Sequence, residues 1–404
     1  MIRIPDNLTK ATHFLLGNPE HIEDAPNILF HPLRIDFLAD LSKELISGSQ
    51  SKAFPDLVTF AFWCRRANIE SVAKRWDNSR LRVGLGLVFH VTPSNVPINF
   101  AYSLIFAFLS GNASVVRLPS RESTQCDLVI EALQRLLRED KYQSLLHTIH
   151  LLRYDKADQI TEFWLQNSLG RVVWGGDATV AHIRSLKSHP RSREIAFVDR
   201  YSVSVVKARD VMEADLSRLH ELCVGLYNDV YLMDQQACSS PQLMVWIGSQ
   251  REISAAQSKL WPAFQQYVKG KYSIEPVHAM DKYVGLCREV IDHQNISSVV
   301  AENPLLYRIQ LDSLAINQCQ QRGYFGTIHE FSAEDLKSLA QIVDARFQTM
   351  TYFGFKQEAL RQFVTSNRLP GVDRVVPIGR ALEMGFYWDG FDIISSLSRQ
   401  VEIQ

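Results

Sequence analysis

The residue with the clearest potential for chemistry is Cys238, in the polar, turn-like segment DQQACSSP at 234–241. This segment directly precedes an apolar run. Cys223, in contrast, lies within the apolar stretch HELCVGLY, which is typical of a buried structural cysteine. Polar neighbours and loop amides stabilise a thiolate, the form in which cysteine acts as a nucleophile. The segment indicates a catalytic cysteine, with an ordinary loop cysteine as the alternative.

A second candidate is Asn95, which stands between two prolines in VTPSNVP at 91–97, after an apolar run. Prolines on both sides restrict the backbone and so hold the asparagine in place. A fixed side-chain amide can donate to an oxyanion and stabilise a tetrahedral adduct. The alternative is an asparagine that forms a turn and caps the helix that follows.

Two further features are suited to binding a dinucleotide. Gly175 and Gly176 in VVWGGDATV follow an apolar run and precede a helical pattern, so a phosphate can approach the backbone and the helix N-terminus. Asp177, the next residue, would repel a phosphate unless it points away. Arg117 in SVVRLPS stands at the end of another apolar run, where a cation can meet an adenosine ribose or its phosphate. The alternatives are a plain turn and a solvated arginine.

Composition excludes several classes of function. The 43 Lys and Arg nearly balance 44 Asp and Glu, so no global charge favours nucleic acid or an anionic membrane. The apolar window VPINFAYSLIFAFL at 96–109 is shorter than the roughly 20 residues of a membrane helix, which predicts a buried helix. The N-terminus lacks the pattern of a signal peptide, so we expect a cytoplasmic protein. The six cysteines are widely spaced, which predicts mostly buried thiols and no metal site.

Apolar runs and helical patterns alternate between residues 82 and 207. This alternation predicts a parallel, doubly wound sheet, in which ligands bind where loops leave the carboxyl ends of strands. The loops at 92–97 and 175–177 lie at such ends. We expect strands at 82–91, 114–118, 148–153, 170–174 and 195–207, and helices at 97–109, 123–138, 156–167 and 178–187.

A second α/β block follows, and residues 1–75 have mainly helical patterns. In the second block we expect a helix at 208–227, a loop at 234–240, a strand at 242–247, a helix through 268, and strands at 307–311 and 350–353. We predict three parts: a cofactor-binding domain with N-terminal helices at 1–207, a catalytic domain at 208–373, and a C-terminal segment at 374–404. The last would return to the cofactor domain or form an oligomer contact.

The order of these segments resembles the aldehyde dehydrogenase superfamily. Its members have a proline-flanked Asn loop, a GN-x-VV-x-K segment, a strand–Gly–helix cofactor turn and a GQ-x-C nucleophile loop; here these read VTPSNVP, GNASVVRLP, VVWGGDATV and DQQACSS. The segments FPDLVTFAFWCRRANIE and VDRVVPIGRALEMGFYWDGFDIISSLSRQV resemble the acyl-CoA reductase family more narrowly. That family includes the fatty acid reductase subunit of bacterial luminescence. The resemblance implies two doubly wound Rossmann-type α/β domains and a small C-terminal oligomerisation segment.

The resemblance also implies roles for individual residues. Cys238 matches the nucleophile, and Asn95 matches the oxyanion donor, with the Cys238 backbone N–H as its partner. Arg117 takes the place of the family's lysine, but SVVRLPS has one extra residue before its proline, so Ser120 or Arg121 can be nearer the cofactor. Gly176 matches the glycine of the cofactor turn. The full set expected to contact the cofactor is Thr92, Pro93, Arg117, Ser120, Gly175, Gly176 and Asp177.

Two departures from the superfamily pattern are informative. The water-activating Glu of the ELGGK motif has no counterpart in IAFVDRYSV, because Glu194 is out of register. The Glu of the E-x-F-G motif, which holds the nicotinamide ribose, is replaced by Gly323 in GYFG. The first loss suits a reductase, which must not hydrolyse its thioester; the second leaves the ribose contact unassigned.

The resemblance therefore implies an acyl-CoA or acyl-carrier thioester reductase that forms an aldehyde through a thioester on Cys238. NADPH is the expected cofactor, with NADH as the alternative, and a homodimer or homotetramer is expected. Two other functions stay open: an aldehyde dehydrogenase working in the oxidative direction, and a non-catalytic scaffold subunit. Retention of Cys238 and Asn95 disfavours the scaffold, and absence of the motif Glu disfavours hydrolytic oxidation.

Overall fold

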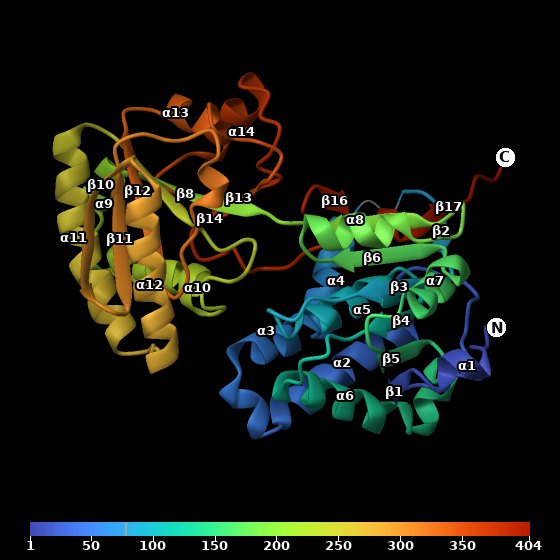
Figure 1. The fold of residues 1–404 in the computed structure, drawn as a ribbon. Coiled ribbons are helices and arrows are strands. Elements are labelled where there is room, and N and C mark those ends of the chain that lie inside the picture. The colour runs from blue at the N-terminus through green and yellow to red at the C-terminus, as the bar shows by residue number, and fades with distance from the viewer. Residues whose placement is uncertain (77–78) are drawn as a thin grey trace. The chain divides into compact units, whose positions relative to one another are not determined.

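The computed structural model describes residues 1–76 and 79–404 and divides the chain into two compact units (Figure 1). Unit 1 consists of Met1–Asp199 and Gly385–Gln404, and unit 2 is the continuous segment Arg200–Met384. The first boundary lies before the predicted position after residue 207, and the second lies beyond the predicted position after residue 373. The functions predicted for these parts remain predictions.

Unit 1 contains a six-stranded sheet with the order β1-β5-β4-β3-β6-β7. All neighbouring strands are parallel except β1, which pairs antiparallel with β5. The chain moves from β3 outward to β5, then returns to the other side of β3 to form β6, as in a doubly wound sheet. The strands are β1 (His13–Leu16), β3 (Leu87–Val91), β4 (Ala113–Arg117), β5 (Ile149–Arg153), β6 (Gly170–Trp174) and β7 (Arg193–Phe197).

Helices connect these strands, and local sequence explains where several begin. Pro32 occupies the first turn of α2, and the Ser123 side chain caps α6 by accepting a hydrogen bond from the Cys126 N–H. Almost every residue of α5 is buried, as its apolar sequence predicts. The helices of unit 1 are α1 (Asp6–Thr9), α2 (Pro32–Ser47), η1 (Gln50–Ala53), α3 (Pro55–Trp63), α4 (Arg66–Arg75), α5 (Asn99–Leu109), α6 (Thr124–Leu137), η2 (Asp140–Leu145), α7 (Asp158–Asn167), α8 (Asp177–Ser185) and α15 (Ile393–Ser396).

The single strand predicted at 82–91 is wrong, because it is two strands in two sheets. β2 (Arg82–Gly84) pairs antiparallel with β17 (Ser398–Gln400), whereas β3 enters the six-stranded sheet. Between them Gly86 has a φ of +122°, which favours glycine. The Asn112 side chain accepts hydrogen bonds from the Leu85 and Gly86 N–H groups and fixes this break. A short hairpin, β15 (Tyr387–Trp388) and β16 (Phe391–Asp392), completes the strands of unit 1.

Unit 2 contains a seven-stranded sheet with the order β10-β11-β12-β9-β8-β13-β14. Its strands are parallel except at one edge, where β10 pairs antiparallel with β11. Parallel strands covered on both faces are expected to be nearly continuously apolar, and β9 (LMVWI) is buried throughout. The strands are β8 (Tyr201–Lys207), β9 (Leu243–Ile247), β10 (Ile296–Asn303), β11 (Leu306–Leu311), β12 (Thr327–Ala333), β13 (Phe347–Phe353) and β14 (Arg374–Pro377).

Two helices of unit 2 pack on opposite faces of this sheet. Glu330 of β12 contacts Trp261 of α11, while its neighbour His329 contacts Glu289 of α12. α11 begins with a capping box formed by Ser249 and Glu252. The helices are α9 (Ala208–Glu213), α10 (Leu216–Tyr231), α11 (Gln250–Lys269), α12 (Pro276–Asp292), η3 (Gln318–Gln320), α13 (Lys337–Ala340) and α14 (Gln357–Ser366).

Two other predicted elements are also divided in the structure. The strand predicted at 195–207 is β7 of unit 1 followed by β8 of unit 2, with the polar Asp199–Arg200 between them. The helix predicted at 208–227 is α9 followed by α10, because Asp215 starts a new helix by capping the Arg218 N–H. The remaining predicted strands and helices are confirmed, with ends shifted by a few residues at most. No helix among the described residues is long and apolar enough to span a membrane.

Candidate active site

The carboxyl ends of three neighbouring parallel strands in unit 1 bring the predicted cofactor residues to one sheet edge. β4, β3 and β6 lie side by side, so the segments after Arg117, Val91 and Trp174 leave the sheet together. Thr92 ties two of these segments, because its N–H and its hydroxyl both donate to the Arg117 carbonyl, at 3.3 and 2.8 Å. Strands are added on one side of β3 up to β5 and on its other side from β6 onward, so the strand order switches between β3 and β6. Doubly wound sheets bind ligands at this switch point.

Asn95 lies in the loop after β3, and its side chain is exposed. The helix-capping alternative is wrong, because α5 begins at Asn99 and its N-cap residue is Ile98, with no side-chain cap. The loop is anchored by Cys126 of α6, whose thiol donates to the Pro97 carbonyl at 3.3 Å. Burial raises the pKa of the Cys126 thiol, so this cysteine is a structural anchor and a poor nucleophile.

Arg117 has a defined position at the end of β4. Its guanidinium lies over the ring of Tyr154, 4.5 Å from the ring centroid. The Tyr154 hydroxyl contacts Thr161 at 3.0 Å, which fixes the ring. Within the described chain no carboxylate pairs with Arg117, so its charge is available to a ligand. Ser120 and Arg121 lie further along the same segment and are both exposed.

The glycines after β6 shape an open helix N-terminus. A side chain at Gly175 would collide with Thr179, whereas a Cβ at Gly176 would meet no atom within 4 Å. Gly176 is the N-cap of α8, and it is exposed together with Asp177 in the first turn. The open space allows a ligand to reach the backbone at this end of the helix. Asp177 is the predicted contact at this helix end whose negative charge would repel a phosphate.

Cys238 lies in unit 2, in the loop between α10 and β9. Cys238 and Cys287 are exposed, whereas the other four cysteines are buried. The loop is fixed at Cys238 by Ser202 of β8, whose hydroxyl donates to the Cys238 carbonyl at 2.7 Å and accepts from the Thr349 N–H. The backbone around Cys238 is thus held while its side chain reaches solvent.

Gln235, three residues before Cys238, holds the other side of this loop. Its buried side chain donates to the Pro241 and Thr327 carbonyls at 2.9 and 2.8 Å. The same side chain accepts hydrogen bonds from the Gly326 and Thr327 N–H groups at 3.1 and 3.0 Å. All four bonds go to backbone groups, so one side chain clamps the Cys238 loop to the segment at the start of β12.

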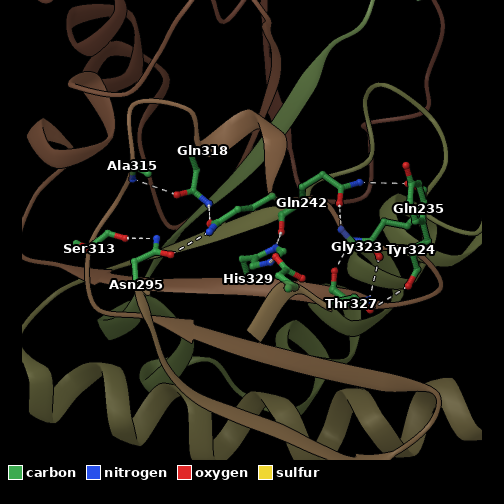
Figure 2. Close-up of polar contacts among 12 residues, drawn as sticks. Gln235, Gln242, Asn295, Ser313, Ala315, Gln318, Gly323, Tyr324, Thr327 and His329 are labelled. Atoms are coloured by element: carbon green, nitrogen blue, oxygen red, sulfur yellow. Dashed lines mark hydrogen bonds and ion pairs between the residues drawn. The ribbon is translucent and has the colours of Figure 1, made fainter. Parts of the chain in front are cut away.

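Gln242 extends this clamp, as Figure 2 shows. Its amide donates to the Gln235 carbonyl at 3.2 Å and accepts from the Gly323 N–H at 2.9 Å. The Gln242 carbonyl contacts the ring of His329, which also pairs with Glu289 of α12. A second polar chain lies nearby in Figure 2, in which the Gln318 side chain donates to Gln321 and Gln321 donates to Asn295.

Lys282 of α12 supports the same segment through the Phe325 carbonyl. It is buried, and its ammonium donates to the Pro304 carbonyl at 2.8 Å and to the Phe325 carbonyl at 2.7 Å. Burial lowers the pKa of Lys282 to about 7. Phe325 and Gly326 both have positive φ angles, 56° and 82°, so this turn needs such external support.

The structure bears on both departures from the superfamily pattern. Glu194 on β7 is bound by Arg171 and Arg184, each at 2.7 Å, and is committed to ion pairs. A side chain at Gly323 would collide with Thr327, because a Cβ there lies 2.3 Å from the Thr327 Cβ. A ribose-binding glutamate cannot occupy position 323 in this backbone.

Sequence reasoning missed Gln235, Gln242 and Lys282. The signal for Gln235 was present, because DQQAC has glutamine where the GQ-x-C pattern has glycine. Gln235 keeps a glycine-like φ of +61°, and its side chain gains the four bonds of the clamp. No group of three or more potential metal ligands is present among the described residues.

A model of the family described as acyl-CoA reductase (LuxC) matches residues 55–400, which is most of the chain. The chain belongs to the acyl-CoA reductase (LuxC) family. The family predicted from the sequence is therefore confirmed.

One curated relative and several solved structures are similar to this acyl-CoA reductase family member. The long-chain acyl-protein thioester reductase of Aliivibrio fischeri is 22% identical over 166 residues, which are 40% of this chain. The match spans only 32% of that relative's length. Aldehyde dehydrogenase 21 of Physcomitrella patens covers 91% of the chain with a TM-score of 0.63 and 12% identity, over 84% of its own length. Lactaldehyde dehydrogenase of Escherichia coli covers 91% with a TM-score of 0.61 and 11% identity, over 85% of its length. These structural similarities confirm the predicted aldehyde dehydrogenase-like fold.

Proposed function

We propose that this protein reduces an acyl thioester to an aldehyde, using Cys238 as the nucleophile. The observation that carries the proposal is the combination of an exposed Cys238 on a clamped backbone with membership of the acyl-CoA reductase family. The similarity to a long-chain acyl-protein thioester reductase supports a fatty acyl substrate, carried either by coenzyme A or by a protein.

In the acylation step, the Cys238 thiolate attacks the carbonyl carbon of the thioester. A bond forms from this carbon to the Cys238 sulfur, and the bond to the carrier sulfur breaks. The carrier leaves as a thiolate, which is a good leaving group and takes a proton from solvent. Asn95 is proposed to donate its side-chain N–H to the carbonyl oxygen while that oxygen carries negative charge.

The residues at the carboxyl edge of the unit 1 sheet fit a nicotinamide dinucleotide. The open N-terminus of α8 at Gly176 suits a phosphate, and Arg117, which has no carboxylate partner in the described chain, offers a cation on the neighbouring segment. When bound, a reduced nicotinamide supplies the hydride that brings the acyl group to the aldehyde oxidation level. Release of the aldehyde then breaks the bond to sulfur and restores the Cys238 thiolate.

NADPH is the proposed form of the cofactor, and Arg117 is the residue proposed to select it. A guanidinium binds phosphate oxygens through two parallel hydrogen bonds, so it suits the 2′-phosphate that distinguishes NADPH from NADH. Thr92, Pro93, Ser120, Gly175 and Asp177 are proposed as further cofactor contacts. A homodimer or homotetramer and a location in the cytoplasm complete the proposal.

Intact-mass spectrometry tests the nucleophile directly. Incubation with a panel of acyl-CoAs without NADPH should add one acyl mass, and Cys238→Ala should abolish this addition. Cys287→Ala is the matched control, because Cys287 is also exposed and should leave acylation unchanged. Acylation that persists in Cys238→Ala and is lost in Cys287→Ala would overturn the assignment. Absence of acylation in the unaltered protein, with every acyl-CoA and acylated carrier tested, would favour a scaffold subunit.

A further inference from the structure

Helix α12 is apolar on the side that faces away from the sheet. Its inner side carries Lys282, Leu286 and Glu289, and Glu289 hydrogen-bonds to His329 of β12. The opposite side is exposed and largely hydrophobic. The exposed fractions are 59% for Val277, 63% for Met280, 38% for Val284 and 80% for Ile291, and Cys287 is exposed in the same row.

The spacing of this row is that of a helix–helix seam. Val277, Met280, Val284, Cys287 and Ile291 are separated alternately by three and four residues, the repeat with which one helix packs along another. We call these five residues the outer stripe. Among the described residues, 18 large hydrophobic side chains are exposed, and six of them lie on α12. A concentration of this kind marks an interaction surface.

The two flanks of the outer stripe differ in charge. One flank carries Asp281 and Arg288, seven residues apart and therefore two turns apart on the same side of the helix. Neither residue forms an ion pair within the described chain, and Gly285 between them leaves open space. The other flank carries the exposed Tyr283 and Val290. A partner must meet one acidic and one basic residue on the first flank.

A second copy of α12 satisfies this requirement when it runs antiparallel. A two-fold axis perpendicular to both helices places the charged flank of one helix beside the same flank of the other, in reversed order. Asp281 then faces Arg288 of the second copy, and Arg288 faces its Asp281, so two ion pairs form. In a parallel pair the charged flank would instead face the flank with Tyr283 and Val290.

We propose that the outer stripe binds the outer stripe of a second copy of this chain, antiparallel, about a two-fold axis near Val284 and Gly285. A helix of 17 residues is about 25 Å long, which alone provides less than the roughly 800 Å² per partner of a standard interface. We therefore expect a dimer that forms at micromolar concentration. In Figure 1 the helix is the labelled α12 of unit 2. This proposal is independent of the chemistry of Cys238.

Sedimentation velocity across about 1–100 μM protein is the first test. The unaltered chain should shift toward a dimer, and Val284→Asp should weaken the dimer at least about tenfold by placing two carboxylates at the axis. Ile316→Asp is the matched control: Ile316 is 87% exposed and lies in unit 2 outside α12, so this variant should still dimerise. A chain that remains monomeric at 100 μM, or a dimer that Val284→Asp does not weaken, would overturn the proposal.

A charge exchange tests the identity and direction of the partner. Asp281→Arg and Arg288→Asp should each weaken the dimer, because each places like charges opposite one another, by about tenfold. The double variant Asp281→Arg/Arg288→Asp should restore it, a result that misfolding cannot produce. Failure of the double variant to recover would exclude the antiparallel pair.

A cross-linking experiment tests the position of the two-fold axis. In a Cys287→Ser background, Val284→Cys should form an intermolecular disulfide under mild oxidation, because position 284 faces its own copy. Val290→Cys on the flank is the control and should not. Equal cross-linking at both positions would contradict the proposed axis.

Discussion

The Cys238 loop of unit 2 and the proposed cofactor edge of unit 1 are held in place by different means. The Cys238 loop precedes a strand, and buried side chains bind its backbone at both sides: Gln235 before the cysteine and Ser202 at it. The segments at the cofactor edge follow strands, and the sheet itself places them, with the Thr92 hydroxyl as a cross-tie. The first region depends on particular buried amides, whereas the second depends on the path of the chain. Substitutions of the residues that hold the Cys238 loop should therefore affect stability, whereas substitutions at the proposed cofactor edge should affect ligand binding and chemistry.

The largest effect is expected at Asn95. Its side chain is exposed and caps no helix, so Asn95→Ala should leave stability unchanged. If Asn95 donates to the oxyanion, kcat should fall about 10²–10³-fold with KM little changed. Steady-state kinetics with acyl-CoA measures this, and Ser94→Ala is the neighbouring control. A fall smaller than about threefold would remove Asn95 from the reacting atoms.

Gln235→Ala should destabilise unit 2. It leaves two buried N–H groups and two carbonyls without their partner, and each unsatisfied buried group costs about 1–3 kcal/mol. We expect a loss of about 3 kcal/mol or more in the free energy of unfolding, measured by urea denaturation. Gln235→Gly should be about 1 kcal/mol more stable than Gln235→Ala, because glycine suits the φ of +61°.

Gln236→Ala is the control for this clamp, because Gln236 is partly exposed and no hydrogen bond of its side chain is seen in the described chain. Equal losses for Gln235→Ala and Gln236→Ala would mean that the loop is simply intolerant of change. If both variants were as stable as the unaltered protein, the clamp would contribute nothing.

Arg117→Ala should weaken NADPH more than NADH. Charge-assisted hydrogen bonds contribute about 1.5–3 kcal/mol, so the ratio of the two dissociation constants should change by about tenfold or more. Fluorescence titration of both cofactors gives this ratio. Arg121→Ala is the comparison: a larger change there would transfer the role to Arg121, and equal weakening of both cofactors by Arg117→Ala would assign Arg117 to the ribose or to packing on Tyr154.

The smallest effect per step is expected from pH, one unit at a time, at Lys282. Its folded-state pKa of about 7 lies below its usual value of 10.5, so the unfolded chain binds more protons between these values. Stability should therefore rise with pH above about 7, by about 1 kcal/mol per pH unit. Lys282→Met lacks this group, so the advantage of the unaltered protein over Lys282→Met should grow between pH 7.5 and 9. A difference that stays constant across this range would mean that Lys282 remains charged throughout.

The sequence predicted most elements of the fold, and its failures have a common physical cause. The strand at 170–174 was predicted with its observed ends, because Gly170 and Gly175 bound an apolar run. The runs at 82–91 and 195–207 each joined two strands, because residue type shows that a segment is extended but not which sheet it enters. The interruptions are Leu85–Gly86 and Val198–Arg200, and both are short.

The site residues also divide into those that residue type indicates and those that depend on distant partners. Cys238, Asn95 and Gly176 could be proposed from the sequence, because each proposed role demands one residue type within a recognisable segment. The departure of Gln235 from the GQ-x-C pattern was visible in the sequence, but its role was not, because that role depends on a left-handed backbone and on partners about 90 residues away in sequence. For α12 the hydrophobic pattern would predict the wrong buried side, because the apolar row is exposed and Lys282 is buried.

Because unit 1 is built from both ends of the chain, the order of synthesis constrains how the protein folds. The Asn112 side chain, which fixes the break before β3, also donates to the Leu397 carbonyl at 2.8 Å, and β2 has no strand partner until β17 exists. Unit 2 is continuous, so it can fold while unit 1 still waits for its last segment. At 5–20 residues per second, the ribosome needs roughly 10–40 s to make the intervening unit. During that interval β2 of nascent unit 1 is held by its bridge to Ile28 and leaves its other edge open, the kind of edge through which partly made chains associate.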